Sequence, residues 1–322
     1  MDEREAVRPL SDRKLPRREW LGAVAAVGTA AAAAHVASAA PAVPSQWRTS
    51  FNTSCIRGQM LPLPEQVRIT AAAGYNAIEP WLRDIEQFVQ SGGSLADARK
   101  QISDAGLTIE SAIGFANWIV DDEAARKAGL EQLRRDMDTI HQLGGTRIAA
   151  PPAGATNADY PKLDLFVVAE RYRAALEVGR EIGVVPQLEV WGFSKNLSRL
   201  GETVFAAVES GHPDACVLPD IYHIRRGGSD FAGLKLLSGA AVHVFHVNDY
   251  PSATPRAELT DAQRVYPGDG DAPLREIVAN LRASGFNGVL SLELFNREHW
   301  KQDPLVVAQR GRESIQRMLE LA

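Results

Sequence analysis

Cysteine is scarce in this chain, which has two among its 322 residues, Cys55 and Cys216. Two cysteines cannot form the network of disulfides that stabilises small secreted domains, and a chain of this length can bury a large apolar core without one. Both fall in segments with strand-like sequence that lie far apart in the chain. We therefore expect two free, buried thiols and assign neither of them a nucleophilic role.

An excess of positive charge is also absent. The chain has 35 Lys and Arg residues against 40 Asp and Glu residues, which gives a formal net charge of −5. A mildly acidic protein has no electrostatic attraction to the phosphates of nucleic acid or to an anionic membrane. We therefore expect no nucleic-acid partner and, once the N-terminal segment described next is removed, no membrane partner.

The N-terminal apolar run is too short to span a membrane. It comprises about fifteen small residues, follows the charged stretch SDRKLPRREWLG and ends at Ala37-Ser38-Ala39, which fits an A-x-A cleavage site. This layout predicts an export signal over residues 1–39, followed by a short leader over 40–48. Arg17 and Arg18 resemble a twin-arginine signal, which predicts a periplasmic protein that is exported already folded. An ordinary secretory signal is the alternative.

A Gly-rich phosphate-binding loop is missing after the first predicted strand, where the sequence reads FNTSCIRG. This absence disfavours a doubly wound nucleotide-binding sheet. Instead, short apolar runs alternate with amphipathic stretches, and two of these, 122–144 and 162–183, run up to a glycine. The runs that predict strands are 49–54, 76–81, 108–115, 146–152, 185–191, 215–220, 242–248 and 288–294. Eight strand–helix units over residues 49–322 predict one α/β domain, a (β/α)8 TIM barrel, with the doubly wound sheet as the alternative.

Ionisable side chains occur near the C-terminal ends of the last four predicted strands. In a TIM barrel these ends form the active-site face, and every second residue of a strand points into the barrel. This alternation places one inward side chain on each strand, namely Glu189, Asp220, His246 and Glu293. We therefore expect these four groups to meet at the mouth of the barrel.

Three carboxylates gathered beside one imidazole in such a confined site would repel each other, because like charges at close range repel strongly, unless a cation lay between them. A donor set of carboxylate oxygens with a single imidazole nitrogen suits Mn²⁺ first, with Mg²⁺, Co²⁺ and Zn²⁺ as alternatives. We therefore predict one bound divalent cation. For each residue taken singly, a structural salt bridge is the alternative.

The motifs LEVWG, DIYH, FHVND and LELFN contain these residues and resemble the xylose-isomerase-like TIM barrels, a family of divalent-metal sugar isomerases and epimerases. The resemblance covers the chain from the first predicted strand almost to the C-terminus. It implies that Glu189, Asp220, His246 and Glu293 bind the metal and that the two glutamates move protons at a substrate carbon. It also implies that His223 binds a substrate oxygen and that the protein is a homo-oligomer, because family members are commonly dimers or tetramers.

These implications predict a metal-dependent isomerase or epimerase that acts through an enediolate on a small ketose or keto-sugar. Ketose 3-epimerases carry an arginine soon after the histidine of strand seven, which this chain lacks; Arg256 or the later Arg264 are the available substitutes. Other substrate contacts are expected from residues near strand ends or in the long loop after strand seven. The predicted contacts are Glu79, Trp118, Trp191, Asp249 and Arg256.

Three alternative functions stay open. A dehydratase or lyase would use the same metal and base on inososes, 3-keto sugars or their glycosides. A phosphodiesterase like the apurinic endonucleases would need more histidines than the seven of this chain, and its nucleic-acid substrate is disfavoured by the acidic charge. A non-enzymatic sugar-binding barrel would have no reason to keep all four metal ligands.

Overall fold

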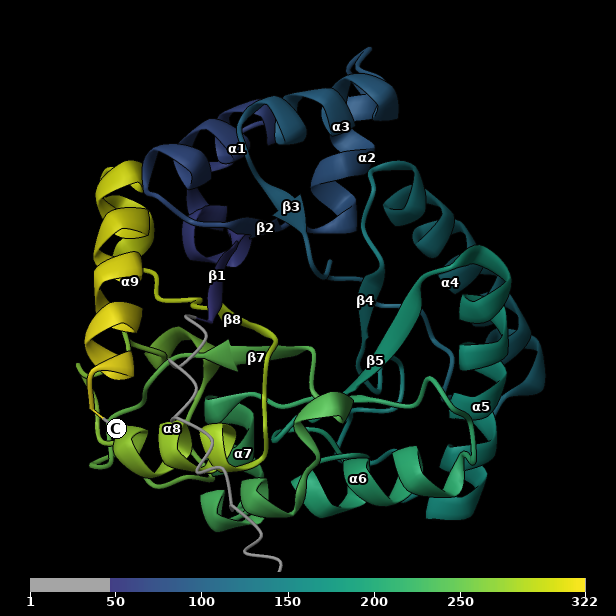
Figure 1. The fold of residues 1–322 in the computed structure, drawn as a ribbon. Helices are drawn as coiled ribbons and strands as arrows, with labels where there is room; N and C mark the ends of the chain where they lie inside the picture. Colours follow the sequence, from purple (N-terminus) through teal and green to yellow (C-terminus); the bar gives the residue numbers. More distant parts are fainter. Residues whose placement is uncertain (1–46, 322) are drawn as a thin grey trace, which may run out of the picture. The chain divides into compact units, whose positions relative to one another are not determined.

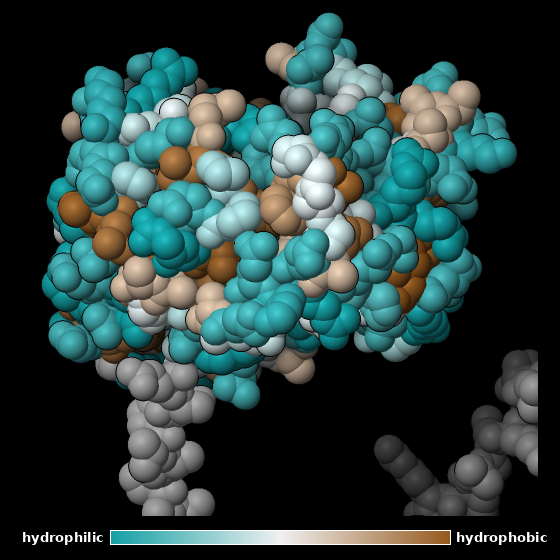
Figure 2. Space-filling view, turned by 90° about the horizontal axis from the view of Figure 1, so that it is seen from above, coloured by the Kyte–Doolittle hydropathy of each residue, from teal (hydrophilic) through white to brown (hydrophobic). Residues whose placement is uncertain are grey.

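The computed structural model describes residues 47–321, which belong to one compact unit. The predicted export signal, 1–39, and most of the leader lie outside the described residues. Within 47–321, no helix is both long enough and apolar enough to cross a membrane. Hydrophilic side chains predominate on the face shown in Figure 2, with hydrophobic groups scattered between them.

Eight parallel strands form the centre of the fold, one in each segment that the sequence predicts. They are β1 Arg48–Asn52, β2 Ala77–Glu79, β3 Thr108–Ile109, β4 Arg147–Ala150, β5 Val185–Glu189, β6 Val217–Leu218, β7 Val244–Val247 and β8 Val289–Leu292. The strands pair in the orders β3-β2-β1-β8-β7 and β4-β5-β6. Figure 1 shows them as a ring with the helices outside, which is a TIM barrel and confirms the predicted fold class.

Short contacts close the ring where regular strand pairing stops. The Ala149 amide donates to the Ala112 carbonyl at 2.9 Å and so joins β4 to the segment that follows β3. Isolated bridges between Val217 and Val242 and between Asp220 and His246 join β6 to β7. The last bridge lies at the C-terminal face, so the closure of the barrel brings two predicted metal ligands into adjacent positions.

A helix or pair of helices follows most of the strands along the chain, and α5 begins and ends at residues suited to those positions. Their bounds are α1 Leu63–Ala72, α2 Leu82–Gln90, α3 Leu95–Asp104, α4 Glu123–Gln142, α5 Leu165–Ile182, α6 Leu200–Glu209, α7 Ile221–Gly227, α8 Leu274–Ala283 and α9 Pro304–Leu319. The carboxylate of Asp164 accepts from two backbone amides at the start of α5, and Gly183 ends that helix with a φ of 86°. The two helices predicted in detail from the sequence, α4 and α5, are both present.

Two layers of apolar packing follow the alternation along the strands. Inside the barrel, a small buried cluster joins Trp81, Ile113, Ala149, Leu218 and Val244, which come from β4, β6, β7 and the segments that follow β2 and β3 and so meet in the interior. Their neighbours along the strands, such as Val217 and Phe245, belong to the larger core shared with the helices. The inward and outward directions predicted for β6 and β7 are therefore correct.

The two cysteines, Cys55 and Cys216, are free and buried, as expected. Cys55 lies in a 3-10 turn, η1 Thr53–Gln59, rather than in the first strand itself. The long segment between β7 and α8 is closed by Asp249, whose carboxylate accepts from the backbone amides of Tyr250, Gly268 and Ala272 at 2.8–2.9 Å. This buried aspartate sets the course of the loop that carries Arg264.

Candidate active site

The four residues predicted to meet at the barrel mouth do meet there, and all are buried. Glu189 is the last residue of β5, and Glu293 directly follows β8. Asp220 precedes α7, where its Oδ1 accepts from the backbone amide of His223 at 2.7 Å. His246 lies within β7. The strand ends therefore fix all four side chains on one face of the barrel.

His246 is the centre of this cluster. Its Nδ1 atom lies 3.3 Å from a carboxylate oxygen of Glu293, 3.7 Å from one of Glu189 and 3.8 Å from one of Asp220. One donor atom each from Glu189, His246 and Glu293 lie within 4.8 Å of one another. Three carboxylates from three strands thus surround one imidazole nitrogen.

The surroundings of the imidazole fit a divalent cation. Nδ1 of His246 is buried and has no hydrogen-bond partner among the described residues. Its Nε2 atom faces both carboxylate oxygens of Glu79, at 3.1 and 3.2 Å, and a proton on Nε2 satisfies that contact. The lone pair on Nδ1 is then free and points toward the carboxylates, which is the arrangement that a metal-binding histidine needs.

Glu79 has a different place from the one predicted for it. The sequence suggested a polar wall residue that touches substrate, but the side chain is fully buried below the cavity. Its Oε2 atom accepts from Asn52 at 3.0 Å and from Ser291 at 2.7 Å, in addition to facing His246. Its depth in the barrel therefore corrects the prediction: Glu79 orients the imidazole.

The pKa values of the ionisable groups in the cluster are shifted in different directions. Burial raises the pKa of Glu189 well above its ordinary value, and it also raises the pKa of Asp220. Burial acts in the same sense on Glu293, but His246 and Arg264 outweigh it and lower the pKa of that carboxyl. For His246, burial is outweighed by Glu293 and Glu79, which raise its pKa. The pKa values of Glu189 and Glu293 are thus shifted in opposite directions, which is a recurrent property of acid–base pairs.

Arg264 is a site residue that the sequence-based prediction passed over in favour of Arg256. Its Nη1 atom donates to Asp220 at 2.9 Å and to Glu293 at 2.8 Å, and its Nη2 lies 3.0 Å from Nε2 of His223. Arg256 is exposed on the same loop and lies against Gly228, away from the cavity. The structure therefore corrects this prediction: the arginine that borders the cavity is Arg264, not Arg256.

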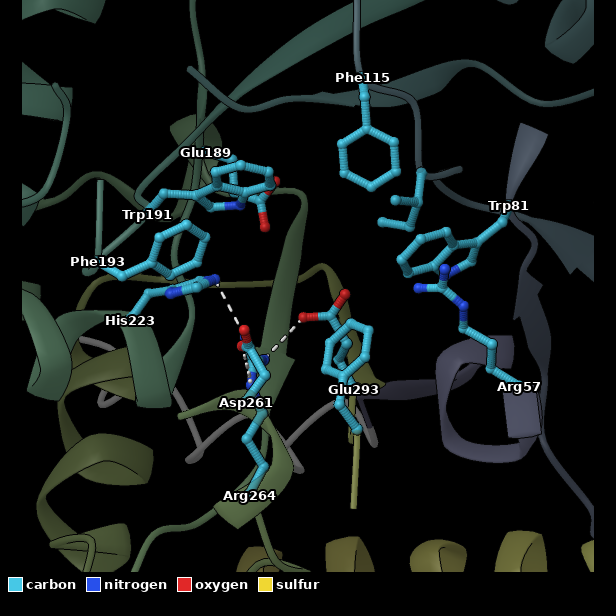
Figure 3. Close-up of a pocket in the computed structure, with 12 residues that line it drawn as sticks. Arg57, Trp81, Phe115, Glu189, Trp191, Phe193, His223, Asp261, Arg264 and Glu293 are labelled. Atoms are coloured by element: carbon cyan, nitrogen blue, oxygen red, sulfur yellow. Dashed lines mark hydrogen bonds and ion pairs between the residues drawn. The ribbon is translucent and has the colours of Figure 1, made fainter. Parts of the chain in front are cut away.

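A cavity of about 360 Å³ opens above the cluster (Figure 3). Glu189, Glu293, His223 and Arg264 border it, with aromatic side chains around them. Trp191 borders the cavity as the sequence predicts. The volume of the cavity lies within the range typical of small-molecule sites.

Two other predicted substrate contacts lie elsewhere. Trp118 is buried in the core, where its Nε1 donates to the carbonyl of Pro151 at 2.8 Å and its ring lies near Tyr172. Asp249 is turned into its own loop and does not border the cavity. Asp249 does lie near the end of β7, but its carboxylate is occupied by backbone hydrogen bonds. Trp118 lies well beyond the end of β3 at Ile109, and its side chain turns into the core.

A parallel eight-stranded barrel with acidic and histidine side chains gathered at its C-terminal face defines a class of barrel enzymes with a metal-type site. Comparison with known protein families identifies the particular family. Residues 67–318 match the model of the xylose isomerase-like TIM barrels, and the chain belongs to that family. The resemblance noted in the sequence is thereby confirmed.

Similar curated proteins are enzymes that isomerise, epimerise or dehydrate small molecules. An inosose isomerase of Bacillus velezensis is 25% identical over 243 residues, which is 74% of this chain and 85% of that protein. A 3-dehydroshikimate dehydratase of Pseudomonas aeruginosa is 28% identical over 245 residues, covering 73% of this chain and 36% of that longer protein.

Solved structures share the fold at low sequence identity. The crystal structure of the IolI protein with a bound zinc atom superimposes with a TM-score of 0.78 at 20% identity, over 85% of this chain and 98% of that one. An L-ribulose 3-epimerase gives a TM-score of 0.68 at 17% identity, over 85% and 95% of the two chains.

Proposed function

We propose that this protein is a divalent-metal-dependent isomerase or epimerase that moves a proton at the carbon beside a carbonyl group in a keto-sugar or inosose. One observation carries the proposal. Glu189 and Glu293, from strands β5 and β8, both border the cavity and both approach the same nitrogen of His246. Two carboxylates at a shared metal-type centre suit a reaction in which one group removes a proton and another returns it.

The cation would be held by Glu189, Asp220, Nδ1 of His246 and Glu293. When bound, such an ion polarises substrate oxygens and makes the carbon-bound proton between them more acidic. Mn²⁺ is the first choice for this oxygen-rich donor set, with Mg²⁺, Co²⁺ and Zn²⁺ as alternatives. The similarity of the fold to a zinc-containing structure supports a metal here and leaves its identity to experiment.

The side chains around the cavity would have different roles in the reaction. One glutamate takes the proton from the substrate carbon, which gives an enediolate, and the other returns a proton on the opposite face or at the neighbouring carbon. Arg264 and His223 border the cavity beside Glu293 and would hold substrate oxygens. Aromatic side chains around these polar groups would contact the C–H face of the sugar and exclude water.

Deuterium exchange tests the proton transfer directly. The metal-loaded protein is incubated in deuterated water with ketoses, inososes and 3-keto glycosides, and NMR and mass spectrometry follow the label and the product mass. Glu293→Gln and Glu189→Gln should each abolish exchange while the fold, followed by circular dichroism, stays intact. The exposed Glu131→Gln is the control. Full exchange in Glu293→Gln would refute the assigned role.

A dehydratase is the second candidate, and the similarity to 3-dehydroshikimate dehydratase favours it. One carboxylate would remove the proton from carbon, and the other carboxyl group would donate a proton to a β-hydroxyl group, which leaves as water, so the product would be lighter by one water molecule. An isomerase or epimerase conserves the mass of its substrate. The mass spectra from the same substrate panel therefore separate the two functions.

We also propose that residues 1–39 direct export by the twin-arginine route, on the strength of the charged, apolar and A-x-A segments of the sequence. Changing both Arg17 and Arg18 to Lys should retain the protein in the cytoplasm of a bacterial host, whereas the unchanged chain should reach the periplasm. Unchanged export of the double variant would instead favour an ordinary secretory signal.

A further inference from the structure

Five aromatic side chains form a nearly continuous band around the cavity, which we call the aromatic collar: Phe295, Trp81, Phe115, Trp191 and Phe193. Successive ring centroids along this band are separated by 5.9, 5.2, 6.0 and 5.1 Å. The band ends beside His223, whose ring centroid lies 5.5 Å from that of Phe193. The collar therefore runs from the end of β8 to the start of α7, around the reacting groups (Figure 3).

The collar has a fixed inner part. Trp81 is 7% exposed, and its Nε1 donates to the side chain of Asn52 at 3.0 Å. Asn52 in turn donates to Glu293 at 3.1 Å, so this ring is tied to the carboxylate cluster. A keto-sugar that reacts at Glu189 and Glu293 would lie beside this inner part and use its apolar surface.

The outer part of the collar is exposed without any evident structural need. Phe115 is 45% exposed and Phe193 is 40% exposed, and because both rings pack near Trp191 they form one aromatic patch rather than isolated exposed side chains. They follow different strands, β3 and β5, yet both rings turn into the mouth of the cavity (Figure 3). Water at these rings would be released by a ligand that offers an apolar surface, which favours binding of such a ligand.

We propose that the substrate is a keto-sugar that carries an aromatic aglycone, with the sugar at the carboxylates and the aglycone between Phe115 and Phe193. This inference rests on the proposed function. A sugar alone presents one modest C–H face, whereas the collar offers aromatic surface at two depths. A planar aromatic group attached to the sugar would contact the outer rings while the keto-sugar occupies the inner site, and aromatic pairs of this kind favour offset or edge-to-face contacts.

Matched glycosides test the inference. Methyl 3-keto-β-D-glucoside and phenyl 3-keto-β-D-glucoside differ only in the aglycone. Calorimetry with Mn²⁺-loaded protein gives the dissociation constant of each, and deuterium exchange gives kcat and KM. We expect the phenyl glycoside to bind roughly tenfold more tightly, since each aromatic contact is worth about two- to tenfold in affinity.

The variants Phe115→Ala, Phe193→Ala and the double variant locate the effect. In the double variant, the dissociation constant and KM should rise for the phenyl glycoside more than for the methyl glycoside, so that most of the preference for phenyl over methyl is lost. Phe166→Ala is the matched control, because Phe166 is 62% exposed on α5 and does not border the cavity. That control should keep the full preference.

Each other outcome has a definite meaning. Equal binding of the two glycosides, equal loss for both in the double variant, or no binding of either would overturn the inference. A dimer, detected by sedimentation, that the double variant abolishes while glycoside binding is unaffected would assign the outer rings to a second copy of the chain and also overturn it. Tighter phenyl binding without any deuterium exchange would support the inference and contradict the proposed proton transfer.

Discussion

Nε2 of His246 lies 3.1 Å from Oε2 of Glu79, on the side of the imidazole ring away from the other carboxylates. This contact holds the proton on Nε2 and directs Nδ1 at Glu189 and Glu293. Asn52 and Ser291 hold the Glu79 carboxylate in turn. A carboxylate that does not border the cavity thus sets the orientation of His246, the residue whose nitrogen would bind the proposed cation.

Replacing Glu79 should therefore weaken cation binding without altering the cavity wall. Glu79→Leu removes the acceptor for the Nε2 proton, and we expect the dissociation constant for Mn²⁺ to rise by about 10–100-fold. Glu79→Gln keeps an acceptor and should lie between this variant and the unchanged protein. Calorimetric titration of the metal-free protein measures the effect. Equal Mn²⁺ affinity in Glu79→Leu and in the control Glu131→Gln would show that the orientation of His246 does not depend on this contact.

Removing the cation should lower the thermal stability of the protein. The folded state gathers carboxylates that repel one another, and a bound cation stabilises it by mass action, by about 2.7 kcal/mol at a hundredfold excess over the dissociation constant. For a domain of this size we expect Tm to rise by roughly 5–10 °C when the chelated protein is reloaded. Calorimetric scans with chelator and with Mn²⁺ measure this shift, and His246→Gln should largely lose it. An identical Tm in both conditions would contradict a cation site at this cluster.

Arg264 and the cation should partly substitute for each other. The guanidinium neutralises Asp220 and Glu293, so Arg264→Met removes the positive charge paired with these buried carboxylates and should destabilise the metal-free protein by about 3–5 kcal/mol. Added Mn²⁺ supplies positive charge at the same oxygens, and its stabilising effect should be larger in Arg264→Met than in the unchanged protein. Urea unfolding with and without Mn²⁺ measures both effects.

The matched control for that comparison is Arg180→Met, which breaks an exposed pair with Asp214. It should change stability by less than about 1 kcal/mol in either condition. If Mn²⁺ stabilised Arg264→Met and the control equally, the charges of Arg264 and the cation would be independent.

The alternation of residues along the strands was enough to find Glu189, Asp220, His246 and Glu293, because strand geometry fixes both their direction and their depth. It gave Glu79 the correct inward direction but not its contact with His246, which depends on how neighbouring strands are staggered. Arg264 has no such periodicity to reveal it. Its place depends on the loop closed by Asp249 and on carboxylates 29 and 44 residues away in the chain. Trp118 shows the converse: its segment follows β3, but local backbone direction turns the ring into the core.

A buried carboxyl group outside the site gives a prediction about pH. Asp136 on α4 is 4% exposed and has one weak contact, from Gln132 at 3.4 Å. Burial raises its pKa from 3.8 to about 6, and Glu86 adds to the effect. Because its pKa is raised in the folded state, Asp136 binds its proton more tightly there than in the unfolded chain. Its contribution to the free energy of unfolding is therefore fully present below the unfolded pKa and is lost as the pH rises through about 6.

Asp136→Asn should therefore stabilise the protein near neutral pH and not in acid. We expect its free energy of unfolding at about pH 7.5 to exceed that of the unchanged protein by up to about 3 kcal/mol, and the difference to shrink toward zero near pH 4. Urea unfolding across this range measures the difference. Asp138→Asn, on the exposed face of the same helix, is the control and should show no such trend. A constant difference between Asp136→Asn and the unchanged protein across the range would mean that the aspartate is not held at a raised pKa, since only a shifted titration makes the effect of the substitution depend on pH.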